Sequence, residues 1–513
     1  MTAFIKKTAA LLLLAAFLSA LHPGVLALEG ALTGGVLPFF GGSGTEDDPY
    51  LISSEDELRA FASLVGSGES CEGLFFLLTE DVALSGGGEA PNRTPAGTGA
   101  NGEITMFRGS FSGGGHTVSR MRAAVSDNDS PAGIFAGVEC GEIRDLVLSS
   151  AFVSGHTRSG GLAGVARDAV IENVSFTGSA ECSAAGDHSL GGIAGSAEGA
   201  SMTGCSAAVL LEGSEYAGGL CGIAQDSSFA FCRSSGTVSA SQYSGGVCGF
   251  CFDCVFSDCV NEAAVTGEDH RIGGVAGNAR TSDFERCENL GEISGERYIG
   301  GVTGFCCGCS LVSCSNRGPV HGSWYVGGVV GWSDDGAEFG DSGLVNRLKY
   351  CMNTGAVTGE WGVGGIIGDS HDAVAEDCFS TGNIFSDEYA GGIAGYSAES
   401  SFIRCCGVGN VRADSFEGAV VGKVSYVGSE FENCVFLEGC CASGDGFASP
   451  RGAFELLEET AYPGFDFGGC REISREGYPY ARLVFLAPPS RNIRSSPKPA
   501  YIFIKNAFIR AKT

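Results

Sequence analysis

Apolar residues recur along this chain in short runs, and a pair of glycines marks each run. The stretch YIGGVTGF at 298–305 returns 27 residues later as YVGGVVGW. The first glycines of the pairs follow one another in steps of 31, 27, 27, 28, 27, 27, 37, 27 and 27 residues: Gly160, Gly191, Gly218, Gly245, Gly273, Gly300, Gly327, Gly364, Gly391 and Gly418. A period of this length is typical of a solenoid, a propeller or an array.

Within one repeat, the GGVAG run precedes a polar turn, a short strand that ends at cysteine, a Gly turn and a β-branched strand such as GEISG at 291–295. Three strands leave no room for a helix, and a propeller blade needs about 40 residues. The pattern therefore predicts an all-β fold, a parallel β-helix (β-solenoid) of about a dozen coils of ~27 residues that share one core. The Gly pair would mark a corner that needs positive φ or close backbone approach.

Cysteine and asparagine occupy fixed places in the repeat. Nine of the 23 Cys fall at one position of successive coils: Cys205, Cys232, Cys259, Cys287, Cys314, Cys351, Cys378, Cys405 and Cys434. Val174 fills that place one coil earlier, so we expect buried free thiols there rather than disulfides. Two positions later stand Asn261, Asn289, Asn316 and Asn353, whose stacked amides can hydrogen-bond along the solenoid.

The N-terminal region suggests export and a cap. Lys6 and Lys7 precede the apolar run 8–21, and residues 25–27 (VLA) allow cleavage after Ala27. A membrane anchor is the alternative, although the run is shorter than the ~20 residues of a span. The segment 53–65 (SSEDELRAFASLV) has a Ser N-cap, early acids and apolar Leu58, Phe61 and Leu64, which predicts an amphipathic helix covering the first coil.

Charge narrows the classes of partner. The formal net charge is −29, and it becomes −31 when Lys6 and Lys7 are removed. A protein with so much negative charge is not expected to bind nucleic acid or anionic membranes. It is suited to being soluble outside the cell. We expect a secreted or cell-surface-associated monomer, with no transmembrane anchor in the mature chain.

The repeat resembles the GLUG-motif proteins, which are bacterial secreted and surface proteins. GGVAGNARTSDFERCENLGEISG (273–295) and GGVTGFCCGCSLVSCSNRGPVHG (300–322) carry the motif. Segments 42–65, 76–86 and 107–123 look like the segments that precede such repeats, and 462–483 looks like the one that closes them. The resemblance implies a right-handed parallel β-helix outside a bacterium, often adhesive, with no catalytic residues.

These features divide the chain into five parts. We expect a signal peptide (1–27), an N-terminal cap with the first coils (28–130), the repeat solenoid (131–440), a closing segment (441–485) and a basic, disordered tail (486–513). The tail RNIRSSPKPAYIFIKNAFIRAKT (491–513) carries six Lys/Arg and no acid, unlike the rest of the chain. It is either native or the product of a truncation.

Two local patterns could bind metal. Cys251 and Cys254 share the spacing of Cys306 and Cys309, but the coils are two apart, so the pairs are poorly placed for one zinc ion. A local disulfide or plain core thiols are the alternatives. The step of 37 residues contains the acids Asp334, Asp335, Glu338 and Asp341, which form either a solvated loop or a calcium site. Calcium is the one cofactor that the sequence suggests.

An aromatic residue stands about two places before most Gly pairs: Tyr216, Tyr243, Tyr298, Tyr325, Trp361 (one residue off this register), Tyr389 and Phe416. Such a column either packs along the sheet or forms an exposed platform for sugar rings. Alternation does not decide between the two, because a corner follows. The column is the best candidate for a binding site.

No arrangement typical of an enzyme is present in the sequence. The seven His show no ligand spacing, His-Glu-x-x-His is absent, and no acid recurs at one position of the coil. We therefore expect a non-enzymatic, adhesin-like binding or structural module for host or dietary glycans or glycoproteins. The alternatives are a polysaccharide-degrading β-helix enzyme (lyase or glycosidase) and the passive stalk of a larger surface protein.

Overall fold

The computed structural model describes residues 41–86, 95–98, 103–125, 130–182, 188–337, 340, 343–442, 448–452, 455–457, 471–474 and 482–485. The predicted signal peptide, the basic tail, Glu338 and Asp341 lie outside the described residues, as does most of the closing segment. No described helix is long and apolar enough to cross a membrane.

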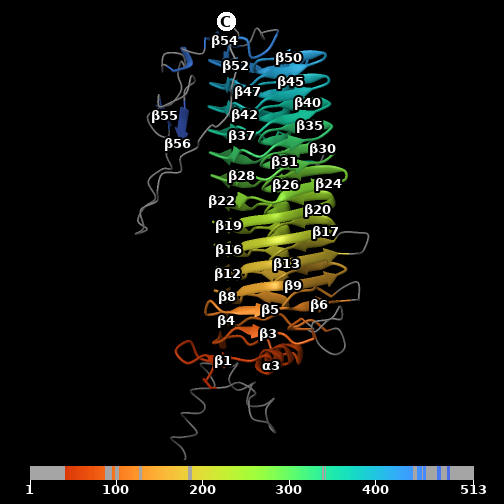
Figure 1. Cartoon of the computed structure of the whole chain (residues 1–513), viewed down its shortest axis with the longest axis vertical. Coiled ribbons are helices and arrows are strands. Elements are labelled where there is room, and N and C mark those ends of the chain that lie inside the picture. Colours follow the sequence, from red (N-terminus) through yellow and green to blue (C-terminus); the bar gives the residue numbers. More distant parts are fainter. Residues whose placement is uncertain are drawn as a thin grey trace, which may run out of the picture.

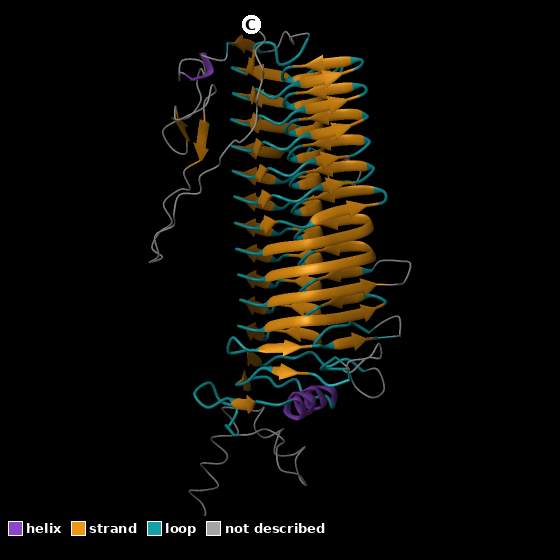
Figure 2. Ribbon diagram, in the orientation of Figure 1, coloured by secondary structure: helices purple, strands orange, loops and turns teal. Residues whose placement is uncertain are grey.

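The chain winds into a β-solenoid of about 13 turns, which confirms the predicted fold class (Figures 1 and 2). One coil begins with β26 (Ala276–Arg280), turns into β27 (Asp283–Glu285), and continues through β28 (Glu288–Asn289), β29 (Ile293–Ser294) and β30 (Arg297–Gly300). The next coil repeats this path one layer higher, and all the sheets of the solenoid are parallel.

The coils build three sheets, here called A, B and C. Sheet A has 14 strands: β1 (Tyr50–Ile52), β2 (Phe75–Leu78), β4 (Ser110–Ser112), β8 (Glu142–Arg144), β12 (Val170–Glu172), β16 (Ser201–Thr203), β19 (Ser228–Ala230), β22 (Val255–Ser257), β27, β32 (Ser310–Val312), β37 (Asn346–Lys349), β42 (Ala373–Glu376), β47 (Ser401–Ile403) and β52 (Glu430–Glu432). Sheet C has 11: β7 (Phe135–Glu139), β11 (Ala163–Arg167), β15 (Ala194–Glu198), β18 (Cys221–Gln225), β21 (Cys248–Phe252), β26, β31 (Thr303–Cys307), β36 (Val330–Asp334), β41 (Ile367–His371), β46 (Ala394–Ala398) and β51 (Val421–Val424).

Sheet B is the widest, with 29 strand segments. In the N-terminal half single long strands cross it, such as β9 (Val147–Gly155), β17 (Ser206–Gly218) and β20 (Arg233–Gly245). In later coils it breaks into shorter pieces, and the last piece of each coil leads to the Gly pair: β25 (His270–Gly273), β30, β35 (Trp324–Gly327), β40 (Trp361–Gly364), β45 (Tyr389–Gly391) and β50 (Phe416–Gly418).

The Gly pairs form the corner between sheets B and C, and close approach is the reason for glycine. A Cβ on Gly300 would lie 1.9 Å from the carbonyl oxygen of Thr303, and one on Gly301 would lie 2.1 Å from that of Gly328. Neither glycine has positive φ, so close backbone approach, and not left-handed backbone, explains the repeat. The other two corners use left-handed residues, such as Thr281 and Arg286.

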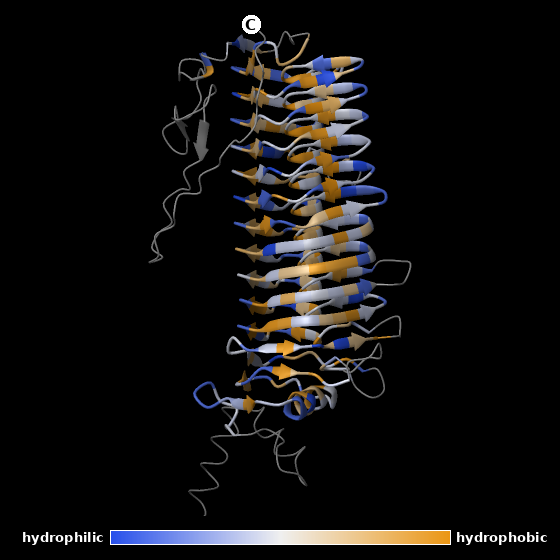
Figure 3. Cartoon of the chain, viewed as in Figure 1, coloured by the Kyte–Doolittle hydropathy of each residue, from blue (hydrophilic) through white to orange (hydrophobic). Residues whose placement is uncertain are grey.

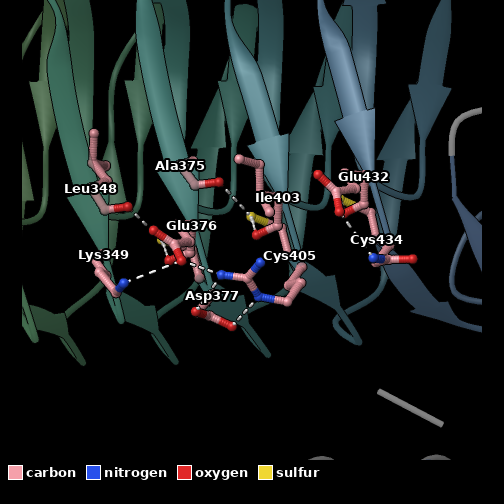
Figure 4. A network of polar contacts seen from close by, with 12 residues as sticks. Leu348, Lys349, Ala375, Glu376, Asp377, Ile403, Cys405, Glu432 and Cys434 are labelled. Atoms are coloured by element: carbon pink, nitrogen blue, oxygen red, sulfur yellow. Dashed lines mark hydrogen bonds and ion pairs between the residues drawn. The ribbon is translucent and has the colours of Figure 1, made fainter. Parts of the chain in front are cut away.

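The interior consists of stacked identical positions, visible as apolar columns along the solenoid in Figure 3. Phe229, Phe256 and Phe284 stack with ring centroids 4.8 Å apart. The described thiols of the cysteine column are free and buried, as predicted. Each donates to carbonyl groups, as Cys405 Sγ does to Ala375 at 3.3 Å (Figure 4).

The asparagine column forms the predicted amide ladder. Asn261 Nδ2 donates to Asn289 Oδ1 at 2.8 Å, Asn289 Nδ2 to Asn316 Oδ1 at 2.7 Å, and Asn316 Nδ2 to Asn353 Oδ1 at 2.8 Å. All four residues are fully buried. Each Nδ2 also donates to the carbonyl group two residues later, so the ladder also stabilises the turn within sheet B that follows each asparagine.

The predicted helix is α3 (Glu55–Gly66), and it begins at the N-cap Ser54. Ser54 Oγ accepts from the Glu57 backbone N–H at 3.4 Å, and the Glu57 carboxylate accepts from the Ser53 backbone N–H at 2.7 Å, in the manner of a capping box. Leu58, Phe61 and Val65 are buried, whereas Leu64, expected on that face, is only partly covered. The ring centroids of Phe61 and Phe76 are 4.8 Å apart, so the helix packs on the first coil.

Candidate functional site: an aromatic corner between sheets B and C

The aromatic column before the Gly pairs points outward. Ile299, Val326 and Val363 are fully buried, and the neighbouring rings of Tyr298 and Tyr325 lie on the opposite face, half-buried. Phe416 is 45% exposed. All seven column residues are partly or largely exposed, so core packing does not account for them. The direction of the column, which the sequence left open, is toward solvent.

A second aromatic column from sheet C meets the first one across the Gly corner. It consists of residues five places after the first glycine of a pair: Phe250, Phe305, Trp332 and Tyr396. The Tyr298 and Trp332 rings stack at 4.7 Å, and those of Trp361 and Tyr396 at 5.8 Å. Phe305 is fully buried, whereas Phe250, Trp332 and Tyr396 are partly exposed. Rings of the two sheets therefore touch across the corner. Sequence reasoning missed this column, although its fixed spacing from the glycines is readable.

We call the two columns, together with Trp324, the aromatic corner. Trp324 was also missed; it is 39% exposed and stacks on Trp361 at 5.6 Å. Trp324 and Trp361 are register partners. Trp361 therefore occupies the place of Trp324 and not that of Tyr325, and Gly362 takes the left-handed position that Tyr325 holds one coil before. From Tyr216 to Phe416 the corner spans eight coils, or about 34 Å at a rise of ~4.8 Å.

Three cations of the chain, Arg271, Arg297 and Lys423, already lie on these rings. The Arg297 guanidinium lies 5.9 Å from the Trp324 centroid. The Arg271 guanidinium lies 4.7 Å from the Phe305 centroid and 5.5 Å from that of Tyr243, and its Nη1 donates to Tyr243 Oη at 3.3 Å. At the other end, Lys423 Nζ lies 4.2 Å from the Phe416 centroid. The rings of the corner therefore present faces that attract positive charge.

A buried acid sits in the sheet C column between Trp332 and Tyr396. Asp369 is 3% exposed, and its Oδ1 lies 3.2 Å from His371 Nε2. Burial raises the pKa of Asp369, and His371 opposes this rise. The Asp369 carboxylate in turn raises the pKa of His371. Burial, followed by the charge of Asp369, also raises the pKa of Tyr325. The middle of the corner thus combines rings with an ion pair.

Acids also follow the rim of the corner on the sheet B side, contrary to the expectation that no acid recurs at one coil position. Asp269, Glu296, Glu360 and Asp387 stand four places before successive Gly pairs, with Ser323 interrupting the column. Backbone bonds from Trp324 N–H to Glu296 and from Trp361 N–H to Ser323 fix this register. The recurrence is hidden in the sequence because Asp, Glu and Ser share the position.

The predicted calcium loop is described only in part. Asp334 Oδ1 accepts from the Gly336 N–H at 2.8 Å, and Asp335 Oδ1 from the Ala337 N–H at 3.0 Å, so both carboxylates cap turns of their own loop. The described residues contain no group of three His, Cys, Asp or Glu placed to hold a metal ion. Calcium binding that includes Glu338 and Asp341 stays a prediction.

The C-x-x-C pairs are core thiols in the structure. Cys251, Cys254, Cys306 and Cys309 are free and buried, and Ala279 separates Cys251 from Cys306 in the sheet register. Burial raises the pKa of Cys254, Cys306 and Cys309, which keeps these thiols protonated. Core packing is therefore the one of the three alternatives that the structure supports.

Basic and acidic residues converge at the corner between sheets A and B, as an enzyme would require (Figure 4). Arg404 Nη2 lies 3.0 Å from Asp377 Oδ2, and both Arg404 and Lys349 contact Glu376. Asp377 is fully buried, and Arg286 makes the same paired contact with Asp258 in another coil. Repetition and full pairing indicate a structural bridge between coils.

Comparisons with known proteins give partial similarity. No family model matches the chain. It is 30% identical over 173 residues to Halomucin of Haloquadratum walsbyi, which is 33% of this chain and 2% of that protein. A solved Bacteroides ovatus structure, named as a putative immunoglobulin A1 protease, matches with 16% identity, a TM-score of 0.25, and coverage of 86% of this chain and 95% of that one. The similarity to GLUG-motif proteins stays a prediction.

Proposed function

We propose that this protein is an extracellular β-solenoid, at or near the cell surface, that binds glycans along the aromatic corner. The observation that carries the proposal is the outward aromatic column of sheet B along eight coils, which meets the partly exposed rings of Phe250, Trp332 and Tyr396 from sheet C. Exposed aromatic rings suit the apolar C–H faces of sugar rings, and a rigid solenoid holds them in place before binding. Several weak contacts on one chain of sugars then add up by multivalency.

Three further points support an extracellular location. The predicted signal peptide, the strongly acidic composition and the similarity to a protein named Halomucin all fit it. The fully paired charge cluster at the corner between sheets A and B gives the polysaccharide-degrading alternative little support. The adhesive function therefore takes precedence over an enzymatic one in this proposal.

The test is to incubate the mature chain with mucins, pectins and host glycans, and to measure retention and newly formed sugar ends together. We expect retention without cleavage, lost in Tyr298→Ala/Tyr325→Ala. The matched control is Phe231→Ala, which removes a 62% exposed ring at another corner and should retain binding. New sugar ends, or equal retention by all three proteins, would overturn the proposal.

A further inference from the structure

The charges around the aromatic corner point to a particular class of glycan. Its middle, from Tyr298 to Tyr389, has acids on both sides. Glu296, Glu360 and Asp387 follow the sheet B rim, and Asp334 stands beside Trp332 on the outer face of sheet C. Glu360 and Asp387 are exposed, and among the residues that the structure describes neither has an ion-pair partner.

Arg271 lies before this middle, Arg297 lies on the Trp324 ring within it, and Lys423 lies on the rings of Tyr389 and Phe416. Three coil steps separate Arg271 from Trp361, and two separate Trp361 from Phe416, where Lys423 lies. At ~4.8 Å per step these are distances of about 14 and 10 Å, beyond the ~8 Å screening length at physiological salt. The nearer Arg297 is paired with Glu296 at 3.6 Å. Arg297 also lies 5.9 Å from the Trp324 centroid, so the excess of negative charge lies beside Trp361, where Glu360 and Asp387 are exposed.

Arg271 and Lys423 also show what these rings accept, since each places a cationic group on an aromatic face. A ligand that offered both a sugar ring and an ammonium group would match the middle of the corner in shape and in charge. Anionic glycans, such as sialylated or uronic chains, would meet repulsion from the rim and from the net charge of −29.

We infer that the aromatic corner prefers glycans that carry free amino groups, that is, deacetylated hexosamine residues. This inference rests on the proposed function and specifies its ligand class. The sugar rings contact Trp324, Tyr325 and Trp361 from the solvent side, while their ammonium groups lie near Glu360 and Asp387. The ring contacts provide the affinity for the sugar, and the acids provide the preference for the amine.

Calorimetry with two matched ligands tests the inference: a hexamer of N-acetylglucosamine and the glucosamine hexamer made from it by removing the acetyl groups. The buffer is set at about pH 6, where such amines are protonated and exposed acids are ionised. We expect about tenfold tighter binding of the glucosamine hexamer, and a smaller preference at high salt.

The variant Glu360→Gln/Asp387→Asn should lose this preference while it keeps its affinity for the acetylated hexamer. Its matched control, Glu430→Gln/Glu432→Gln, removes two exposed acids from sheet A and should keep the preference. Equal affinity of the unaltered protein for both hexamers would overturn the inference and leave the proposed function standing. Binding of neither hexamer would count against both.

A lysine hexamer of the same charge distinguishes recognition of amino sugars from recognition of basic peptides. We expect it to bind more weakly than the glucosamine hexamer, because its side chains offer no sugar ring to contact Trp361. Equal or tighter binding of the peptide, unchanged in Trp361→Ala, would mean charge attraction alone and would overturn the inference.

Discussion

Truncation of one rung of the amide ladder tests the stacked-coil architecture most severely. Asn289 is fully buried; its Nδ2 donates to Gly291 O at 2.9 Å and to Asn316 Oδ1 at 2.7 Å, while its Oδ1 accepts from Asn261 at 2.8 Å. Asn289→Ala removes all three hydrogen bonds at once. Three buried polar groups, one each on Asn261, Gly291 and Asn316, then lose a partner.

The expected loss of stability is about 3–5 kcal/mol. Each buried group that loses its partner costs ~1–3 kcal/mol, and water that enters the space of the missing amide restores part of the sum. Since coils interact chiefly with their neighbours, the loss should be concentrated in the coils between Asn261 and Asn353. At ~1.4 kcal/mol per tenfold, local exchange of backbone amides should speed up by about 10²–10⁴-fold.

Hydrogen–deuterium exchange, read peptide by peptide with mass spectrometry, measures this effect. The control is Asn383→Ala, which breaks an exposed amide pair in which Asn410 Nδ2 donates to Asn383 Oδ1 at 3.3 Å. That change should cost less than ~0.5 kcal/mol. If the backbone amides of Asn289→Ala exchanged as slowly as those of Asn383→Ala in every peptide, the buried ladder would not stabilise the coils, and the reasoning would be refuted.

Three further predictions concern other parts of the fold. Gly301→Ala should destabilise the protein by more than ~3 kcal/mol, seen in denaturant unfolding, because its Cβ would lie 2.1 Å from Gly328 O; near-normal stability would contradict the packed corner. In the native protein a maleimide should label the exposed Cys140 and leave Cys287 and Cys314 unlabelled until unfolding, and rapid native labelling of the column would refute its burial. The Asp369 carboxylate raises the pKa of His371 in the folded state. The ion pair therefore stabilises the fold fully below the unfolded pKa of ~6.5, and this stabilisation is lost as pH rises through the folded pKa of His371. His371→Gln should therefore lower Tm more at about pH 5.5 than at about pH 9, and the reverse order would contradict the ion pair.

The sequence alone predicted much of the scaffold, because a solenoid puts equivalent residues at one place in every coil. The period of the Gly pairs, the alignment of Cys287 with Cys314 and that of Asn289 with Asn316 all translate directly into stacked positions. Helix α3 was predictable for a local reason, since its N-cap Ser54 and its buried Phe61 follow ordinary helical rules.

The candidate site was less predictable, because it depends on the angle between two sheets. The Tyr325 backbone is left-handed (φ 55°), so Trp324 and Tyr325 both face outward, which simple alternation would not place there. The contact of Tyr298 with Trp332 joins residues of neighbouring coils across the Gly corner. The rim acids Glu360 and Asp387 became recognisable only when backbone bonds fixed their register with Ser323.

The central claim, that the aromatic corner binds glycan, has a built-in reporter. The chain contains three tryptophans, Trp324, Trp332 and Trp361, and all three belong to the corner. The most direct measurement is their fluorescence, with acrylamide quenching, during titration with a glycan whose binding calorimetry has established. Our account predicts a changed emission and reduced quenching that saturate together with the heat of binding. Binding that leaves both signals unchanged would place the ligand elsewhere on the protein and would contradict the account.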